Sequence, residues 1–140
     1  MTAHKHIILY AEDDPDDVLI VKQAFEHFDG SIEVMDQPNG VQALRCLEEL
    51  NRSGLLPCLI ILDMNMPAMN GRETLIKIRT SPEFRHIPVV IFTTSSSKMD
   101  QDFVARWSAD FITKPVLYSD LEMLARNFVE RCDSEMKKRA

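Results

Sequence analysis

Short apolar runs alternate with amphipathic helical patterns five times along this chain of 140 residues. A run of about four to eight apolar residues is typical of a buried strand, whereas apolar residues at every third or fourth position are typical of a helix. We expect strands at His6–Ala11, around Ile32 and Val34, and at Cys58–Asp63, Val89–Thr93 and Phe111–Thr113. This alternation predicts an α/β domain with a parallel five-stranded sheet and helices on both of its faces.

A helix is expected after each strand, around residues 18–28, 41–50, 71–78, 99–107 and 119–129. Local residues support three of these helix starts. Asp14 is a good N-cap before Pro15, Ser97 with Asp100 fits a cap, and the segment 119–122 has the pattern of a capping box. The first, third and fourth strands are apolar on both faces and are expected in the centre of the sheet, whereas the second is expected at an edge.

Polar side chains end four of the expected strands. Glu12 and Asp13 end the first, Asp63 ends the third, Thr93 ends the fourth, and Lys114 follows the fifth. Because the carboxyl ends of parallel strands meet at one edge of a sheet, where ligands bind in such folds, these groups are expected to lie together. A carboxylate buried there needs a partner. Such a site suits a divalent metal and a phosphoryl group.

The segment 12–17 holds five acids in six positions. The last three of them suit a helix start, where a cap and negative charge are favourable. That explanation does not cover Glu12 and Asp13, which precede the cap and alone fit a solvated loop as well as a metal site. With Asp63 converging on them, we expect Mg²⁺, which prefers carboxylate oxygens and takes further ligands from a phosphate.

Length and composition predict one domain over residues 1–140, with a core at about 6–130 and a short tail at 131–140 whose basic end is solvated and frayed. The net charge of −6 disfavours nucleic acid as the main partner. Neither a membrane-spanning run nor a signal-peptide pattern is present, so we expect a cytoplasmic protein. Three widely spaced cysteines, Cys46, Cys58 and Cys132, are expected to be reduced thiols, the first two in the core.

Together these motifs resemble the receiver domain of two-component response regulators, over about residues 6–130. The resemblance rests on five motifs in the same order, which are Glu12-Asp13, Asp63 with Pro67, Gly71, Thr93 and Lys114-Pro115. Segments 12–17, 85–90 and 93–96 are most similar to the small single-domain regulators paired with bacterial phytochromes and related sensor kinases. The resemblance implies a flavodoxin-like, CheY-like doubly wound sheet with strand order 2-1-3-4-5.

The resemblance also implies a role for each acid. Asp63 is expected to be the phosphoacceptor, which attacks a phosphohistidine on a sensor kinase and becomes an acyl phosphate. Asp13 and Asp63 are expected to bind Mg²⁺ directly, Glu12 through water, and Asn65 through its backbone carbonyl. Phosphoryl transfer of this kind depends on positioning and charge neutralisation.

Similarly, Thr93 is expected to donate its hydroxyl to a phosphoryl oxygen and Lys114 to pair with the phosphate, with a cis peptide bond before Pro115. Thr94 competes for the hydroxyl role, but the strand end favours Thr93. Phe111 stands where many receivers have tyrosine, so it is either a ring that swings inward on phosphorylation or a static edge residue. The segment Trp107-Ser108-Ala109-Asp110 departs from the family pattern, because it is one residue short and lacks the usual glycine.

Four kinds of function fit at least part of this pattern. A signalling module without an output domain has to present a changed surface, formed by the fourth helix, fifth strand and fifth helix, to a downstream partner, a phosphotransfer protein or a second copy. A haloacid-dehalogenase-like phosphatase usually needs a second acid where Asn65 stands. A flavodoxin-like cofactor carrier needs a Ser- and Gly-rich first loop rather than an acidic one. A pseudo-receiver would not need the complete acid, threonine and lysine set.

Overall fold

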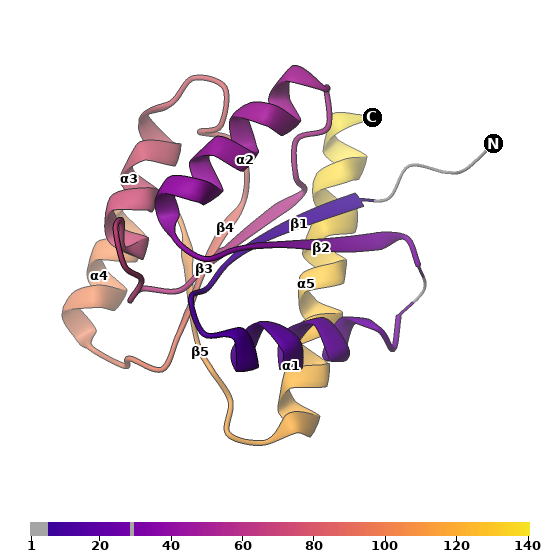
Figure 1. The fold of residues 1–140 in the computed structure, drawn as a ribbon, viewed down its shortest axis with the longest axis vertical. Coiled ribbons are helices and arrows are strands. Elements are labelled where there is room, and N and C mark those ends of the chain that lie inside the picture. Colours follow the sequence, from indigo (N-terminus) through magenta and orange to yellow (C-terminus); the bar gives the residue numbers. More distant parts are fainter. Residues whose placement is uncertain (1–5, 29) are drawn as a thin grey trace.

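The computed structural model describes residues 6–28 and 30–140, in which five strands and five helices alternate (Figure 1). The elements are β1 (His6–Ala11), α1 (Pro15–Phe25), β2 (Ile32–Gln37), α2 (Gly40–Arg52), β3 (Leu59–Leu62), α3 (Gly71–Thr80), β4 (Val89–Thr93), α4 (Lys98–Arg106), β5 (Asp110–Thr113) and α5 (Tyr118–Arg139). Each predicted strand and helix is present, with shifts of a few residues at most ends and a last helix that extends ten residues beyond its predicted end. None of the helices in the described ranges has the length and hydrophobicity to span a bilayer.

All strand pairs are parallel and their order is β2-β1-β3-β4-β5, which confirms the predicted fold class. The register sets the carboxyl ends of the strands level with one another. Ala11 lies beside Leu62, Leu62 beside Ile91, and Thr93 beside Thr113. The residues that follow β1, β3 and β5 therefore leave the sheet at the same edge.

Two apolar layers cover the two faces of the sheet. Figure 1 shows α1 and α5 on one face and α2, α3 and α4 on the other. The first layer includes Phe25 of α1 and Phe128 of α5, and the second includes Leu47 of α2 and Val104 of α4. Since β1, β3 and β4 contribute side chains to both layers, they had to be apolar on both faces.

Most predicted helix starts are confirmed. The carboxylate of Asp14 accepts a hydrogen bond from the Asp16 backbone N–H at 2.9 Å, and Ser97 Oγ accepts from the Asp100 N–H at 3.4 Å. The capping box predicted for α5 is wrong. That helix begins one residue earlier, with Leu117 at the N-cap position and no side-chain cap bond.

The tail predicted at residues 131–140 is helical instead, and the fraying predicted for its basic end, Lys137-Lys138-Arg139, is wrong, because α5 continues to Arg139. The Arg139 guanidinium donates to the carbonyl oxygens of Leu56 at 3.1 Å and Pro57 at 2.8 Å, and it pairs with Glu135 one turn earlier. These contacts tie the last turn of α5 to the loop before β3. The sequence beyond Val129 is mostly polar, so its helical periodicity did not reveal this anchoring.

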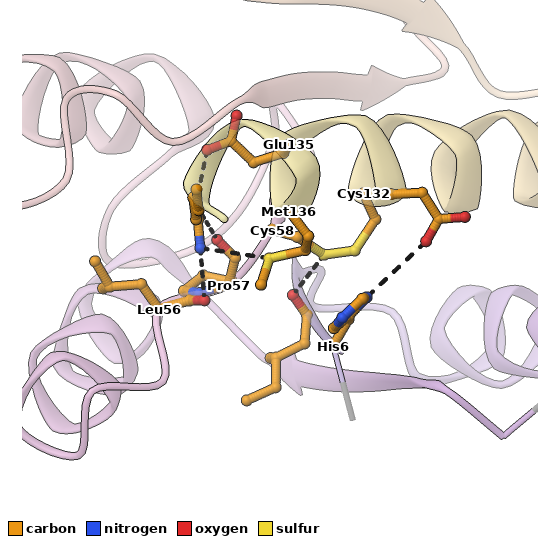
Figure 2. Close-up of a disulfide and its surroundings, with 10 residues drawn as sticks. His6, Leu56, Pro57, Cys58, Cys132, Glu135 and Met136 are labelled. Atoms are coloured by element: carbon orange, nitrogen blue, oxygen red, sulfur yellow. Dashed lines mark hydrogen bonds and ion pairs between the residues drawn. A yellow bond between two sulfur atoms is a disulfide. The ribbon is translucent and has the colours of Figure 1, made fainter. Parts of the chain in front are cut away.

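A third correction concerns the cysteines. Cys58 and Cys132 form a disulfide between the residue before β3 and the second half of α5, with their Cα atoms 4.9 Å apart (Figure 2). Cys46 is free and buried, as predicted. The odd number and wide spacing hid the pairing, which depends on the extra turns of α5 lying over the start of β3.

The turn between α4 and β5 forms without the glycine that is usual at this place in the family. Ser108 itself takes a left-handed conformation, with φ of 56°, in the place where glycine is favoured. Arg79 of α3 supports this turn, because its guanidinium donates to the carbonyl oxygens of Trp107 and Ser108, both at 2.9 Å. It also donates to Ile87 O at 2.8 Å, so one side chain joins α3, the loop before β4 and the loop before β5.

Candidate metal and phosphoryl site

Three acids meet at the carboxyl edge of the sheet. Carboxylate oxygens of Glu12, Asp13 and Asp63 lie within 4.8 Å of one another. Glu12 and Asp13 follow β1 and Asp63 follows β3, and the parallel register of these neighbouring strands sets them side by side. Oxygens at this spacing suit a hard divalent cation.

Asp63 is largely buried, with 7% of its surface exposed. Its backbone N–H donates to the Ala11 carbonyl at 3.0 Å, its Oδ1 accepts from the Asn65 N–H at 3.3 Å, and its Oδ2 lies 2.9 Å from Lys114 Nζ. Burial acts to raise the pKa of Asp63, but hydrogen bonds from Glu12 and Lys114 outweigh it and hold this pKa below its usual value. The carboxylate is therefore charged at neutral pH.

The loop after Asp63 returns close to it through a glycine. Gly71, the first residue of α3, donates its N–H to the Met64 carbonyl at 3.0 Å. A Cβ atom at this position would lie 2.3 Å from the Asp63 carbonyl oxygen. Only glycine permits this approach, which sets the start of α3 against the strand end that carries Asp63.

Glu12 is the most buried of the three acids, with 3% of its surface exposed, whereas Asp13 is exposed. The Glu12 carboxylate pairs with Lys114 and accepts from the Asp14 N–H at 3.2 Å and from the Tyr10 hydroxyl at 3.4 Å. Burial raises the pKa of Glu12 to about 7. Glu12 therefore holds a proton more readily than a surface glutamate.

Lys114 supplies the positive charge. Its ammonium pairs with Glu12 and lies 2.9 Å from both Asp17 Oδ2 and Asp63 Oδ2. Burial acts to lower the pKa of Lys114, but hydrogen bonds to these three carboxylates raise it. The cis peptide bond expected before Pro115 is absent, as in the rest of the described chain. Lys114 reaches the acids with a trans bond, and its N–H donates to the Thr93 carbonyl at 2.8 Å.

Two residues of this site were missed from the sequence. Asp17 was assigned only to the helix start, yet it binds Lys114 from the first turn of α1. Tyr10 was counted as an apolar strand residue, yet its hydroxyl reaches Glu12. The alternation of β1 gave a usable indication for Tyr10, because residues 10 and 12 of an extended chain point to the same side.

Thr93, the last residue of β4, and Thr94, which follows it, differ in burial. Thr93 is fully buried and its Oγ1 accepts from the Ser95 N–H at 3.3 Å. Thr94 is exposed and lines a groove of about 340 Å³ beside Lys114. Phe111 of β5 is half-buried against the α2–α3–α4 side of the core. This placement fits both readings of Phe111.

The sequence model of the family described as the response regulator receiver domain matches residues 8–126 of this chain. The probable methanogenesis regulatory protein FilR2 of Methanothrix harundinacea (strain 6Ac) is 35% identical over 130 residues, which is 89% of this chain and 81% of FilR2. Response regulator Rcp1 of Synechocystis is 32% identical over 96 residues, 67% of this chain and 65% of Rcp1.

Solved structures of response regulators are also similar to this chain. The phosphorylated cyanobacterial phytochrome response regulator RcpA superposes with a TM-score of 0.82 at 30% identity, covering 91% of this chain and 93% of RcpA. The Mn²⁺-bound form of Rcp1 superposes with a TM-score of 0.77 at 28% identity, covering 87% of this chain and 90% of Rcp1. The predicted likeness to small phytochrome-associated regulators is confirmed, and the chain belongs to the response regulator receiver domain family of two-component signalling.

Proposed function

We propose that this receiver accepts a phosphoryl group on Asp63 from a phosphohistidine of a sensor histidine kinase, in a Mg²⁺-dependent reaction. The observation that carries the proposal is the position of Asp63. Its carboxylate lies within 4.8 Å of those of Glu12 and Asp13, which follow β1, and its Oδ2 is 2.9 Å from the ammonium of Lys114. A charged carboxylate beside a cation and a metal-binding pair is suited to attack phosphorus.

The residues present fit a hard divalent cation. Glu12, Asp13 and Asp63 would hold Mg²⁺, with the backbone carbonyl of Asn65 as a further ligand. The spacing of the three carboxylates supports this assignment, and the solved structure of Rcp1 contains Mn²⁺. Bound Mg²⁺ would offset negative charge on the phosphoryl oxygens.

In the transfer, an Asp63 carboxylate oxygen forms a bond to phosphorus as the P–N bond to the kinase imidazole breaks. The bonding electron pair stays on the imidazole nitrogen, and Asp63 becomes an acyl phosphate. Lys114 neutralises charge on the phosphoryl group, and Thr93 donates its hydroxyl to a phosphoryl oxygen. Catalysis by this chain is limited to its own phosphorylation and dephosphorylation.

The response to phosphate is a changed surface formed by α4, β5 and α5. Thr93 ends β4 beside Thr113 of β5, and Phe111 lies two residues before Thr113. Engagement of the Thr93 hydroxyl by a phosphoryl group biases this part of the fold toward a second arrangement, in which the Phe111 ring packs inward. The partners are a sensor histidine kinase, phytochrome-type by similarity to RcpA, and a downstream protein, a phosphotransfer protein or a second copy of the chain.

The test is phosphorylation by a small donor. The protein is incubated with acetyl phosphate and Mg²⁺, and its intact mass is followed over time. We expect one added phosphoryl group that requires Mg²⁺ and is absent from the Asp63→Asn variant. Asp16→Asn is the matched control, since it removes an exposed charge from the same acidic segment, outside the three-acid cluster.

Two results would contradict the proposal. One is an adduct that persists in Asp63→Asn, because the acceptor would then be another residue. The other is the absence of an adduct together with no Mg²⁺-dependent binding of beryllofluoride, a phosphoryl mimic. The second result would identify a pseudo-receiver, whereas beryllofluoride binding without an adduct would indicate fast hydrolysis at Asp63.

A further inference from the structure

We propose that Arg72 and Asp100 are positioning residues that hold Ser95, and through it the Thr93 hydroxyl, in the arrangement of the unphosphorylated protein. The proposal rests on the proposed function of Thr93 and names the residues that set how easily its hydroxyl turns to a phosphoryl group. They form a chain of contacts from the start of α3, across α4, to the end of β4.

The first link joins the threonine to the loop after it. The Thr93 backbone is fixed in the sheet, where its carbonyl accepts from Lys114 N at 2.8 Å. Its side chain is attached to the β4–α4 loop instead, because Thr93 Oγ1 accepts from the Ser95 N–H at 3.3 Å. The position of Ser95 therefore determines where this hydroxyl is held.

The second link fixes Ser95 from two sides. Its hydroxyl donates to Asp100 Oδ2 at 3.2 Å and accepts from the Ser97 N–H at 3.3 Å. Ser97 is the N-cap of α4 and accepts from the Asp100 N–H. Asp100 thus connects the first turn of α4 to the residue that holds Thr93.

The third link joins Asp100 to α3. The other carboxylate oxygen of Asp100, Oδ1, pairs with Arg72, and the Asp100 side chain is 19% exposed. The Arg72 guanidinium also lies over the Phe103 ring, 4.5 Å from its centroid. An arginine held by both a carboxylate and an aromatic face is a defined anchor rather than a loose surface cation.

Arg72 also lies next to the residue that contacts Asp63, at the end of β3. Arg72 is the second residue of α3, and Gly71 before it lies against the carbonyl of Asp63. One end of the contact chain is therefore fixed beside Asp63 and the other holds Thr93, the residue expected to sense phosphate there. The β4–α4 loop is braced between them.

The direction of the effect follows from this geometry. A phosphoryl group on Asp63 offers the Thr93 hydroxyl a new acceptor, and moving Oγ1 toward it costs the Ser95 contact unless the loop follows. While Asp100 and Arg72 hold Ser95, the loop resists this movement. Removing either side chain should lower the cost and tighten binding of a phosphoryl mimic.

The test uses beryllofluoride in the presence of Mg²⁺. We expect Asp100→Asn and Arg72→Ala to bind it more tightly than wild type, by about 2- to 30-fold, the range in which such couplings fall. Affinity for Mg²⁺ alone should not change, because neither residue belongs to the three-acid cluster. Lys98→Ala is the matched control, since it breaks the exposed Lys98–Asp102 ion pair on the same helix, which is not one of the contacts that hold Ser95.

A double-mutant cycle separates positioning through Thr93 from a general effect on folding. In a Thr93→Val background, Asp100→Asn should lose its effect on beryllofluoride affinity, whereas a merely structural role would leave it unchanged. Asp100→Asn nearly preserves side-chain size, so this arm does not depend on the larger change at Arg72.

The outcomes distinguish this proposal from the one on which it rests. Failure of the wild type to bind beryllofluoride, together with the absence of an adduct from acetyl phosphate, would overturn the proposed function itself. Binding by the wild type, with both variants equal to Lys98→Ala, would overturn only the positioning role. Weaker binding by Asp100→Asn would also overturn it, because the contacts would then prepare Thr93 for phosphate instead of holding it away.

Discussion

Nζ of Lys114 lies 2.9 Å from Oδ2 of Asp63, although 51 residues separate the two in the sequence. The same ammonium pairs with Glu12 and Asp17, so a single cation offsets part of the negative charge of three carboxylates, which follow β1 and β3 and start α1. The side chain of Lys114 is 11% exposed, and removing it would leave these acids close together without a counter-charge.

Lys114→Met should therefore destabilise the metal-free protein by about 3 kcal/mol, the lower end of the cost of breaking a buried ion pair. Mg²⁺ should recover part of the loss, because it would bring positive charge to the same acids. Urea unfolding with and without Mg²⁺ measures both effects. Lys98→Met is the control, since the pair Lys98–Asp102 is exposed and should be worth no more than about 1 kcal/mol. Equal losses in the two variants would mean that Lys114 is not a buried counter-charge.

Gly71→Ala should lower the free energy of unfolding by about 1–3 kcal/mol, the usual cost of overpacking. The new Cβ atom would lie 2.3 Å from the carbonyl oxygen of Asp63, so either α3 or the acceptor strand end has to move. We also expect slower phosphorylation by acetyl phosphate, because Asp63 is displaced. Gly30→Ala is the matched control, since a Cβ atom there meets no other atom within 4 Å. Normal phosphorylation of Gly71→Ala would show that the close approach at Asp63 O does not position the acceptor.

The residues at the strand ends could be predicted, because apolar runs in the local sequence mark the strands and a parallel sheet brings their carboxyl ends to one edge. Apolar runs gave the strands, their parallel arrangement placed Glu12 and Asp63 at one edge, and the order of elements placed Lys114 beside them. Tyr10 and Asp17 were missed because each has a sufficient local explanation, one as a strand residue and the other as a helix-start acid. Their contacts with the site depend on side-chain direction, which sequence spacing gives only in part.

The corrections near the C-terminus have a different cause. Arg139 is anchored on the carbonyl oxygens of Leu56 and Pro57, more than 80 positions earlier in the chain. No local pattern reports such a tertiary contact, so the polar end of α5 was read as a tail. The pairing of Cys58 with Cys132 joins the same two segments across 74 positions, and no local pattern reports it either.

Glu12 should make the stability of the metal-free protein depend on pH. Its pKa is raised by burial to about 7, from an ordinary value of 4.5, so the folded state holds this proton more tightly than the unfolded state between those values. The free energy of unfolding should therefore fall as pH rises from about 5 to 7.5, by at most about 3 kcal/mol. The lowered pKa of Asp63 acts below this window, and the raised pKa of Lys114 acts above it.

Urea unfolding of the metal-free protein at several pH values measures this slope. Glu12→Gln should flatten the slope, because the amide has no proton to lose. Glu33→Gln, which changes an exposed glutamate of β2, should leave it intact. The same slope in Glu12→Gln and wild type would assign the pH dependence to another group.

The disulfide should stabilise the folded protein. Cys58 and Cys132 are 74 positions apart, so their bond closes a long loop and removes much conformational freedom from the unfolded chain. Cys132→Ala should lower the free energy of unfolding by about 2–4 kcal/mol, the typical contribution of a disulfide. A thiol reductant should lower the stability of the wild type similarly and leave that of Cys132→Ala unchanged.

Cys46→Ala is the control, because Cys46 is a free buried thiol and this variant should keep its sensitivity to the reductant. The reduced state predicted from the sequence would be correct if unfolding of the wild type did not respond to the reductant and its intact mass equalled that of the chain with three free thiols. The end of α5 would then be held by Arg139 and apolar packing alone.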